Sequence, residues 1–397
     1  MSRDALYACA KQLEDRAEEI VEVLGAETGL LEGRLRAELE RTTGQLRLLG
    51  DHGAAGWRRE SPGIVTVPVP VGTIAVFAAS NFPLAFGILG GDTASAVAAG
   101  CPVIVKAHPA QPRTSELLAL IGSETLPDFE VVYGGPDASL SLVRDPRIKA
   151  VGFTGSLAGG RALMDAAAAR PDPIPVYAEM SSLNPVFVLS NYDGDVAALA
   201  ASVTNSSGQL CTKPGLVITA SAEFAASLAN AVADSTTHRM LTPAMAAAHA
   251  AWQTEAESLG EVVAGKGEPT PFSVIAHEWH PSFGEEHFGP SVVIYLGDEL
   301  PEWEGSLTAT ILAGADDSAE ARALLPALMA KAGRIVWNSV PTGVAVVAAM
   351  QHGGPWPATS APWSTSVGPA SIERFRRPVA LQGVPSEIWS PAGDLNP

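Results

Sequence analysis

Residues 72–107, GTIAVFAASNFPLAFGILGGDTASAVAAGCPVIVKA, contain the pattern that decides the fold. The run 72–79 is short, apolar and bounded by Pro-rich sequence, which indicates a buried strand. The Ala-rich run from Leu84 to Ala99 predicts a helix that ends at Gly100. The apolar run 101–107 predicts the next strand. A strand, a helix and a strand in this order form a βαβ unit, which implies a parallel sheet.

The alternation of strands and helices extends in both directions from this unit. Before it, apolar residues recur at helical spacing from Leu13 to Leu24, so an amphipathic helix is expected there, and a second helix is expected over 30–50. After it, helices are predicted at 157–169 and from about Val196. Further strands are predicted at 129–135, 149–156, 175–180, 184–190, 215–220, 290–297 and 333–340, and residues 265–290 are interpreted as loop. The predicted fold class is α/β with more than one sheet.

The bulk composition excludes several classes of protein. The 397-residue chain is 47% hydrophobic, which is enough for a large core and for two or more domains. Its net charge of −18 argues against a nucleic-acid partner and an anionic membrane surface, because both attract Lys and Arg. The N-terminus lacks an apolar signal core, and the most apolar stretch, 84–105, is too interrupted to span a membrane. The three cysteines are widely spaced, which excludes a disulfide framework and predicts a cytoplasmic protein.

Cys211 lies in the run SSGQLCTKPG, residues 206–215, which is rich in turn-forming residues. A free cysteine more often behaves as a small buried hydrophobic residue. A thiol that stays accessible in a turn is either incidental or chemically active. The sequence lacks the G-x-S-x-G, G-x-G-x-x-G and Walker motifs, so it has no serine hydrolase elbow, ordinary dinucleotide fingerprint or P-loop.

One run of the sequence could be taken for a metal site: HEWH, residues 277–280, with His287 nearby. It lies in the loop-like region and lacks acidic residues at a confirming spacing. Zinc sites need a defined geometry and a second shell of partners. We therefore interpret this run as a solvated loop and predict no metal site.

Polar residues follow three of the predicted strands. Asn81 comes after the first strand, Gly155 and Ser156 lie where a later strand gives way to a helix, and Glu179 follows another strand. The carboxyl ends of parallel strands form the ligand crevice of such sheets, and a helix N-terminus suits a phosphate group. Each feature alone also has a plainer explanation: Ser156 as a helix cap, and Glu179 as a solvated or paired carboxylate.

Several longer motifs occur together in the chain: ASNFPLAFGILGGDTASAVAAGCPVIVKAHPA, VGFTGS, AEMSSLNPVFV, GQLCTKPGLV, EEHFGP, NSVPTGV, MQHGGPWPATS and SIERFRRPVALQGVP. With these motifs in this order, the chain resembles the aldehyde dehydrogenases from about residue 5 to 390. It looks most like the branch with NADP-dependent aldehyde dehydrogenases and α-ketoglutarate semialdehyde dehydrogenases. The resemblance implies a Rossmann-like cofactor domain over 1–179, an α/β catalytic domain over 180–358 and a C-terminal segment, 359–397, with a small β oligomerisation strand.

The resemblance implies a role for each candidate residue. Cys211 would be the nucleophile that attacks the aldehyde carbon, and Glu179 would activate the water that hydrolyses the resulting thioester. The amide of Asn81 and the backbone N–H of Cys211 would stabilise the developing oxyanion. The residues implied in cofactor binding are Lys106 and His108 near the adenosine ribose, Gly155 and Ser156 at the pyrophosphate, Glu286 at the nicotinamide ribose and Phe288 beside the nicotinamide.

Two departures from the family pattern affect the cofactor and the site. Many NAD-using relatives carry Glu three residues after the lysine, whereas this chain has Pro109. Without that carboxylate a 2′-phosphate meets no like charge, so NADP is favoured, with NAD as the alternative. Ser181 replaces the usual glycine after EM, and we expect it to tighten the site near Glu179.

A third departure concerns assembly. The family's opening segment before the first helix is missing, and the arm before the first strand is abbreviated to residues 61–70, three of which are proline. Proline limits pairing in a central strand, whereas the C-terminal strand candidate, 376–383, is intact. We therefore expect a reduced assembly, a homodimer, which is also the commonest closed oligomer.

The implied function is oxidation of a small-molecule aldehyde to a carboxylic acid through a thiohemiacetal and a thioester. One alternative is an acylating or reductive relative, against which the retained Glu179 argues. Another is a non-catalytic binding protein, against which the full set of functional residues argues. The sequence does not name the aldehyde: several arginines could bind a carboxylate, and an apolar tail would equally suit Trp303, Trp356 and Trp363.

Overall fold

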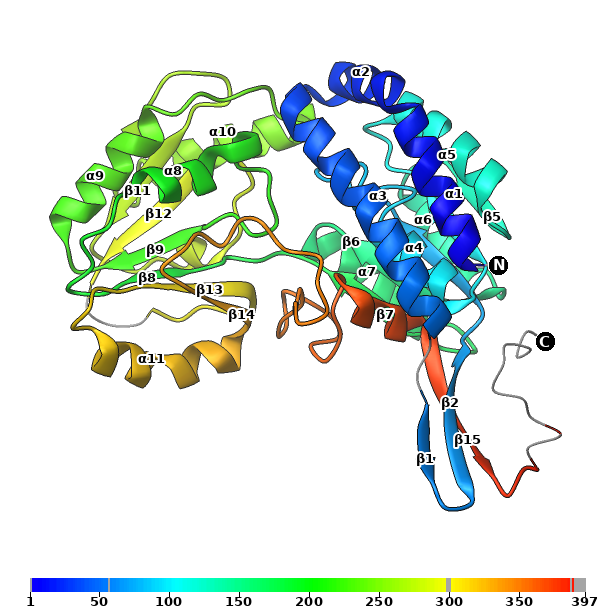
Figure 1. Cartoon of the computed structure of the whole chain (residues 1–397). Helices are drawn as coiled ribbons and strands as arrows, with labels where there is room; N and C mark the ends of the chain where they lie inside the picture. The colour runs from blue at the N-terminus through cyan, green and yellow to red at the C-terminus, as the bar shows by residue number, and fades with distance from the viewer. Residues whose placement is uncertain (1, 56–57, 298–300, 386–387, 389–397) are drawn as a thin grey trace.

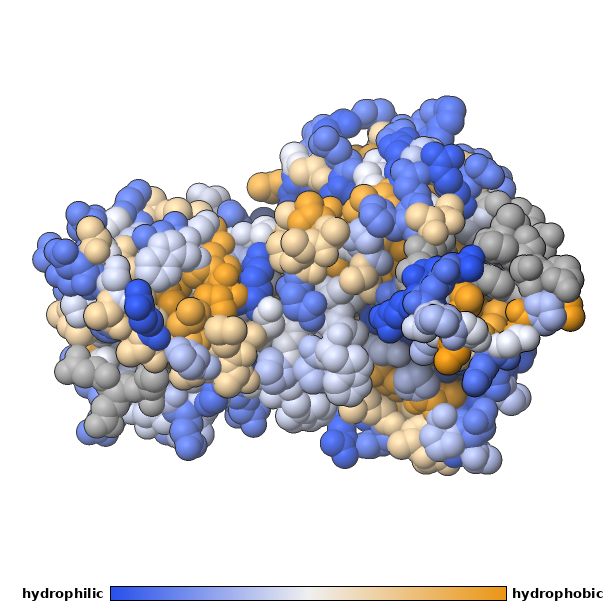
Figure 2. Space-filling model, turned by 60° about the horizontal axis from the view of Figure 1, so that its bottom comes forward, coloured by the Kyte–Doolittle hydropathy of each residue, from blue (hydrophilic) through white to orange (hydrophobic). Residues whose placement is uncertain are grey.

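The computed structural model describes residues 2–55, 58–297, 301–385 and 388. The chain forms two lobes, each built around one sheet, and a slender arm that projects from one of them (Figure 1). In Figure 2 the arm side comes forward, and the two lobes are joined through a narrower middle. Across the described ranges, no helix is long and apolar enough to cross a membrane.

The first lobe contains a parallel sheet of five strands in the order β5-β4-β3-β6-β7, which confirms the predicted α/β class. One face of this sheet packs against the N-terminal helices with α4 and α5, and the other face packs against α6 and α7. The strands are β3 (Thr73–Phe77), β4 (Val103–Lys106), β5 (Phe129–Val132), β6 (Ile148–Thr154) and β7 (Val176–Glu179), and the helices are α1 (Ser2–Asp15), α2 (Ala17–Thr28), α3 (Glu32–Ala55), α4 (Gly91–Ala99), α5 (Pro112–Thr125), α6 (Pro136–Arg144) and α7 (Leu157–Ala168).

Two helical segments of this lobe differ from the prediction. The first N-terminal helix is divided in two at Arg16. Helix α4 begins at Gly91 rather than at Leu84, because the glycines before it lie in tight turns. A Cβ on Gly87 would lie 1.7 Å from the carbonyl oxygen of Pro83, so the chain closes there in a way that only glycine permits. The residues between β3 and α4 form a compact turn that carries Asn81.

The second lobe contains a seven-stranded sheet in the order β10-β11-β12-β9-β8-β13-β14, with β10 antiparallel to its neighbour. Helices α8 and α9 pack on one face, and α10 and α11 pack on the other. The loop prediction for 265–290 is wrong where β11 runs through the sheet, and the buried β13 is a strand that the sequence analysis does not predict. The strands are β8 (Val186–Val188), β9 (Leu216–Thr219), β10 (Glu261–Ala264), β11 (Phe272–Ala276), β12 (Ser291–Leu296), β13 (Ser306–Leu312) and β14 (Ala332–Trp337), and the helices are α8 (Ala197–Thr204), α9 (Ala222–Ala233), α10 (Pro243–Ala256) and α11 (Ser318–Lys331).

The arm is a three-stranded antiparallel sheet of β1 (Arg59–Ser61), β2 (Ile64–Pro70) and β15 (Arg376–Gln382). The prolines do not prevent pairing on one side, because β2 pairs with β15 along its whole length and Pro68 lies opposite Pro378. On its other side, β2 pairs with β1 only through residues 64–66, which fits the expectation that proline limits pairing in a central strand. The prolines therefore lie in the part of β2 that has a neighbour on one side, where a missing N–H is tolerated.

A long segment after β14 crosses between the lobes, drawn in orange in Figure 1. Its backbone bonds to the edge strand β7, with Met180 donating to Ala358 at 2.8 Å and Ser360 donating to Ala178 at 3.0 Å. It also reaches the second lobe, where the Gly305 N–H donates to Trp356 at 3.1 Å. The segment therefore joins the end of the first sheet to the second lobe, next to Glu179.

Candidate active site

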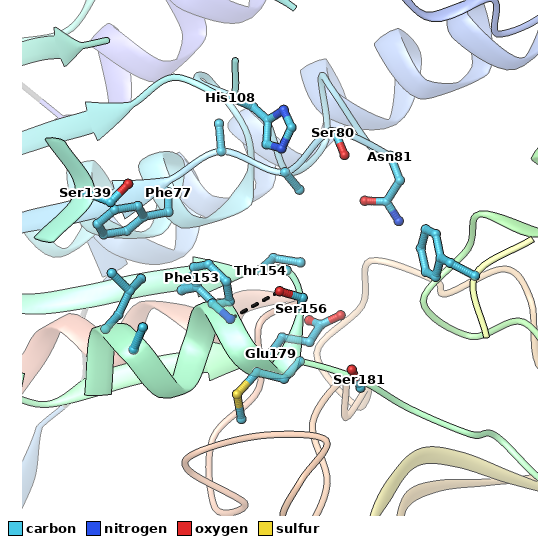
Figure 3. Close-up of a pocket in the computed structure, with 18 of the residues that line it drawn as sticks. Phe77, Ser80, Asn81, His108, Ser139, Phe153, Thr154, Ser156, Glu179 and Ser181 are labelled. Carbon is cyan, nitrogen blue, oxygen red and sulfur yellow. Dashed lines mark hydrogen bonds between the residues drawn. The ribbon is translucent and has the colours of Figure 1, made fainter. Parts of the chain in front are cut away.

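One cavity of about 670 Å³ brings together all nine residues that the sequence analysis singled out. Figure 3 shows Asn81 and His108 on one side of this cavity, with Ser156 and Glu179 on the other. These side chains come from the ends of β3, β4, β6 and β7, as expected for the carboxyl edge of a parallel sheet. The role of each residue stays a prediction. The nine residues are Asn81, Lys106, His108, Gly155, Ser156, Glu179, Cys211, Glu286 and Phe288.

The turn that carries Cys211 is fixed by its backbone conformation. Ser206, Ser207 and Gly208 all have positive φ angles, of 52°, 51° and 67°. Gly208 also packs tightly against Gly289, whose carbonyl oxygen would lie 1.9 Å from a Cβ at this position. The Gly289 N–H donates to the Gly208 carbonyl at 3.2 Å. The cysteine turn is therefore tied directly to the segment that carries Glu286 and Phe288.

Asn184 holds the backbone of the same turn through hydrogen bonds. Its Nδ2 donates to the carbonyl oxygens of Cys211 at 2.9 Å and of Lys213 at 3.0 Å. Its Oδ1 accepts from the hydroxyls of Ser182, at 2.6 Å, and Thr308, at 3.1 Å. Asn184 is fully buried, so these bonds compete little with water and hold the cysteine backbone in place.

Glu179, His352 and Cys211 form a cluster at the end of β7, in which Glu179 and His352 are buried and Cys211 is partly exposed. The Nε2 of His352 lies 3.0 Å from Oε1 of Glu179 and 3.7 Å from Sγ of Cys211. Oε1 nevertheless has no aligned hydrogen-bond partner in the described part of the chain, so its attraction to the imidazole is electrostatic. The other carboxylate oxygen, Oε2, accepts a 2.6 Å hydrogen bond from the hydroxyl of Ser366. The carboxylate is therefore fixed through Oε2, and Oε1 is left for chemistry.

The charges of the cluster shift two pKa values in opposite directions. Burial alone would raise the pKa of Glu179, but the His352 ring, the Ser366 hydroxyl and Arg374 together hold it below its ordinary value. Burial, with the carboxylates of Glu179 and Glu286, raises the pKa of the Cys211 thiol well above its ordinary value. In the protein without ligands the carboxylate is therefore charged and the thiol protonated.

Asn81 lies in the compact turn after β3, and Glu38 organises this turn from α3. One oxygen of the buried Glu38 accepts the backbone N–H groups of Leu84 and Ala85, at 2.8 and 2.9 Å, and the other pairs with Arg34 at 2.6 Å. The Nδ2 of Asn81 donates to the Gln209 carbonyl at 3.1 Å. An amide nitrogen carries two hydrogens, so the second is available to an oxyanion.

The remaining cofactor candidates fit a dinucleotide. Ser156 is the N-cap of α7, where its hydroxyl accepts a hydrogen bond from the Gly159 N–H at 3.2 Å. Its alternative interpretation as a helix cap is therefore also correct. The helix N-terminus still faces the cavity, and its first-turn N–H groups suit a pyrophosphate. Lys106 is buried, which lowers its pKa. Burial and Lys106 lower the pKa of His108 to about 4, so this imidazole is neutral.

Glu286 is another carboxylate in the lining of the cavity. Burial raises its pKa to about 7, against the opposing effects of the Lys213 charge and of hydrogen bonds from Ser182 and Ser181. Burial also lowers the pKa of Lys213 to about 8, and its Nζ donates to the Ser291 carbonyl at 2.8 Å. Ser181, the departure from the family's glycine, therefore acts on Glu286.

The histidines considered for a metal site have other roles. His287 stacks on Trp252 with ring centroids 3.6 Å apart and bonds to the Ser282 carbonyl. His280 caps a short helix, Pro281–Gly284, and His277 is exposed. Within the described ranges, these histidines form no group that could hold a metal ion. The contacts of His287 and His280 show that this segment is more ordered and more buried than the solvated loop that was expected.

Three residues important to the site were missed in the sequence analysis. Glu38 and Asn184 act through backbone groups, and a single sequence gives no signal for such contacts. His352 lies in the motif MQHGGPWPATS, which was quoted only for its family resemblance. Its place in the family's motif was the signal that could have identified it.

A two-lobed α/β protein with a cysteine, a carboxylate and an amide around one dinucleotide-sized cavity is typical of nicotinamide-dependent dehydrogenases. The sequence model of the aldehyde dehydrogenase family matches residues 2–264, and the chain belongs to this family. It is 42% identical to α-ketoglutaric semialdehyde dehydrogenase 2 of Azospirillum brasilense. The alignment is 433 residues long and covers 96% of this chain and 82% of that protein. It is 39% identical to the α-ketoglutaric semialdehyde dehydrogenase of Acinetobacter baylyi. That alignment is 440 residues long and covers 98% of this chain and 83% of that protein.

Solved structures support the same fold. A 3,6-anhydro-L-galactose dehydrogenase in complex with NAP superposes with a TM-score of 0.84 at 20% identity, over 96% of this chain and 86% of that chain. The glyceraldehyde-3-phosphate dehydrogenase GapN of Methanocaldococcus jannaschii, complexed with NADP, gives a TM-score of 0.82 at 19% identity. That superposition covers 96% of this chain and 88% of that chain. The chain is accordingly an enzyme that oxidises an aldehyde with a nicotinamide cofactor.

Proposed function

We propose that this enzyme oxidises an aldehyde that also carries a carboxylate, a semialdehyde, to the dicarboxylic acid with NADP. The observation that carries the proposal is the convergence of Cys211, Glu179 and Asn81 on the same cavity as the cofactor candidates. The names of the two curated relatives support a semialdehyde as the substrate class.

In the proposed mechanism, Cys211 loses its proton to solvent and its sulfur attacks the aldehyde carbon, which forms a thiohemiacetal. Negative charge develops on the former carbonyl oxygen. The second N–H of the Asn81 amide and the backbone N–H of Cys211 stabilise that charge. The bond from Asn81 to the Gln209 carbonyl holds the amide next to the cysteine turn, so the donor needs little reorganisation.

Once an acyl group is on the sulfur, Glu179 acts on the water that hydrolyses it. Its free Oε1 can accept a proton from water, while Oε2 stays bonded to Ser366. When bound, the nicotinamide supplies the oxidising step as a hydride acceptor. The imidazole of His352 supports the charge of Glu179 from 3.0 Å, which makes it a positioning residue.

The cofactor preference is proposed from the adenosine end of the cavity. Lys106 provides a cation there and the exposed Pro109 provides no carboxylate, so a 2′-phosphate finds attraction and no repulsion. The bound cofactors named for two related folds are NADP or NAP, which supports the same preference.

The carboxylate of the substrate is proposed to meet Arg41 and Arg334. Both are partly buried, and burial lowers the pKa of each. The negative charge of an ionised Cys211 acts in the opposite direction on both, so both guanidinium groups interact electrostatically with the cysteine. Both donate to the loop 341–344, Arg41 to the Val344 carbonyl and Arg334 to the Pro341 and Gly343 carbonyls. Their Nε atoms are buried and have no partner in the parts of the chain described, so each guanidinium has a donor that the described contacts do not use, and a small movement of the side chain would present it to an anion.

A substrate with an apolar tail has less support than a substrate with a carboxylate, because the tryptophans that could bind such a tail are poorly placed for it. Trp303 is buried in the second core, where Lys331 lies over its ring, and Trp363 is 82% exposed. The acylating alternative also has less support, because Glu179 is held and charged in the position that hydrolysis requires.

The test is a panel of aldehydes assayed by NADPH formation, with semialdehydes of increasing length beside alkyl aldehydes of matched size. We expect higher kcat/KM for a semialdehyde, and a rise in KM of about tenfold or more for Arg41→Met or Arg334→Met with that substrate only. Arg47→Met is the matched control, because Arg47 lies on the same helix and pairs with Glu14 at the surface. Equal activity on alkyl aldehydes would overturn the substrate assignment, and full activity of Cys211→Ala would overturn the mechanism.

A further inference from the structure

Three potential metal ligands from separate segments converge beside the cavity. The Sγ of Cys211, the Nε2 of His352 and a carboxylate oxygen of Glu179 all lie within 4.8 Å of one another. Nε2 is 3.7 Å from Sγ and 3.0 Å from Oε1. Among the residues that the structure describes, this is the one group of three that could hold an ion.

The geometry fits a tetrahedral zinc ion. Zinc bonds to sulfur at about 2.3 Å and to nitrogen or oxygen at about 2.0–2.2 Å, so its ligands lie roughly 3.2–3.7 Å from one another. The two separations that involve His352, 3.7 Å to Sγ and 3.0 Å to Oε1, lie in or within about 0.2 Å of this range. The third, between Sγ and the carboxylate oxygen, is at most 4.8 Å, so a movement of about 1 Å or less of the two side chains brings it into range. A thiolate, an imidazole and one carboxylate suit zinc, whereas magnesium and calcium prefer oxygen ligands alone.

The surroundings of the cluster also resemble those of a zinc site. The Oε1 of Glu179 is buried without an aligned partner, and Oε2 accepts a hydrogen bond from Ser366, the kind of contact that orients a carboxylate bound to a metal. The side chains of His352 and Glu179 are 2% and 4% exposed, so water competes weakly for a bound cation.

We propose that Zn²⁺ binds to Cys211, His352 and Glu179 and reversibly inhibits the enzyme. The Zn–S bond replaces the S–H bond, the proton leaves to solvent, and no electrons are transferred. Water occupies the fourth position of the ion. A sulfur bound to zinc does not attack an aldehyde, so zinc and aldehyde compete for the same atom. This proposal does not depend on the identity of the aldehyde.

The experiment measures metal binding directly. The purified enzyme is stripped with EDTA and titrated with Zn²⁺ against a chromophoric chelator, and activity is followed in parallel. A second titration with Co²⁺ records thiolate-to-cobalt charge-transfer absorption, which reports a metal–sulfur bond without reference to activity. The variants are Cys211→Ser, His352→Gln and Ser366→Ala, each checked for cooperative unfolding, and the control is His277→Asn, which alters an exposed histidine.

We expect one zinc ion per chain, inhibition that is competitive with aldehyde and reversed by EDTA, and a cobalt–thiolate band. Cys211→Ser and His352→Gln should weaken zinc binding more than about 100-fold, and Ser366→Ala about 10–100-fold, with no change in His277→Asn. Wild-type zinc affinity in His352→Gln, or a cobalt complex without the thiolate band, would overturn the proposal. Should His352→Gln not fold, unchanged affinity in Ser366→Ala would overturn it instead.

Discussion

His352 holds its Nε2 3.0 Å from Oε1 of Glu179, and both side chains are almost fully buried. The contact helps to hold the pKa of Glu179 below its ordinary value, and burial, together with the charge of Glu179, raises the pKa of the nearby Cys211 thiol. A carboxylate that opposes ionisation of the thiol is poorly suited to activate it. The geometry therefore favours water, not the thiol, as the group on which Glu179 acts.

This assignment predicts that Glu179→Gln makes the thiol more reactive while it slows turnover. Removal of a like charge next to Cys211 lowers the thiol pKa, so alkylation by iodoacetamide at pH 7–8 should be faster by about tenfold. Steady-state oxidation should fall, with a burst of NADPH as the acyl-enzyme accumulates. Glu285→Gln changes an exposed neighbouring carboxylate and serves as the control. Slower alkylation of Glu179→Gln would identify Glu179 as the base for the thiol instead.

The pKa of Glu286, raised to about 7 by burial, predicts a pH dependence of cofactor binding. A carboxylate accepts hydrogen bonds from ribose hydroxyls better than a protonated carboxyl group does. Because Glu286 ionises as the pH rises through its raised pKa, NADP should bind more tightly at pH 8 than at pH 6. Fluorescence titration at several pH values measures the dissociation constant. The slope should disappear in Glu286→Gln and persist in Glu285→Gln, and a slope unchanged in Glu286→Gln would assign the effect to another group.

Pro109→Glu should shift the cofactor preference from NADP towards NAD. The new carboxylate would lie beside the position proposed for the 2′-phosphate, and such repulsion is worth about 1–3 kcal/mol, roughly tenfold or more in KM. Pro109→Gln introduces a side chain of similar size without the charge. Initial rates with both cofactors decide the matter. A wild-type preference for NAD would refute the NADP assignment, and equal effects of Glu and Gln would attribute the change to size.

The sequence was sufficient to predict the parallel sheet of the first lobe and the nine residues around the cavity. Strands such as Thr73–Phe77 and Val103–Lys106 contain unbroken apolar runs, and this pattern survives in a single sequence. The buried strand Ser306–Leu312 was missed because its polar Ser and Thr residues interrupt the apolar run. The roles of the nine residues came from the family resemblance, since the pattern around Ser156 taken alone favoured a helix cap.

Contacts between distant segments were the part that could not be predicted. Asn184 bonds to the Cys211 turn, Glu38 to the turn after β3, and His352 to Glu179, each across a separation that no local pattern records. The pairing of β2 with β15 depends on the whole fold in the same way. The sequence therefore did not show that the two arm segments pair with each other.

Glu38→Ala should destabilise the protein and impair oxidation, although Glu38 is on a helix outside the cavity lining. Its removal leaves two buried backbone N–H groups unpaired, at a cost of roughly 2–4 kcal/mol in the free energy of unfolding. Because those groups hold the turn that carries Asn81, kcat should fall more than the affinity for NADP. Glu38→Gln keeps an acceptor oxygen and should recover most of both losses. Urea unfolding and steady-state kinetics measure the two effects, and an unchanged kcat in a folded Glu38→Ala would contradict this role.

The arm leads to the last prediction, which concerns assembly. It projects from the first lobe (Figure 1), and in the described chain its outer strand β15 pairs only with β2. In the second lobe, β14 is likewise an edge strand, and the surface beside it exposes Met329 and Trp337, at 65% and 53%. Unpaired edges and exposed apolar residues are both features that association removes.

We therefore expect a symmetric homodimer in which β15 of each chain adds to β14 of the other. Light scattering should give twice the chain mass of 41.0 kDa. Met329→Arg should shift the equilibrium towards monomer, because it places a charge where the partner strand would pack. Leu120→Arg, at a 48% exposed position on α5 in the other lobe, should leave the mass unchanged. A stable tetramer at low protein concentration would show that the short arm does not limit assembly, and a wild-type monomer would exclude the paired edges altogether.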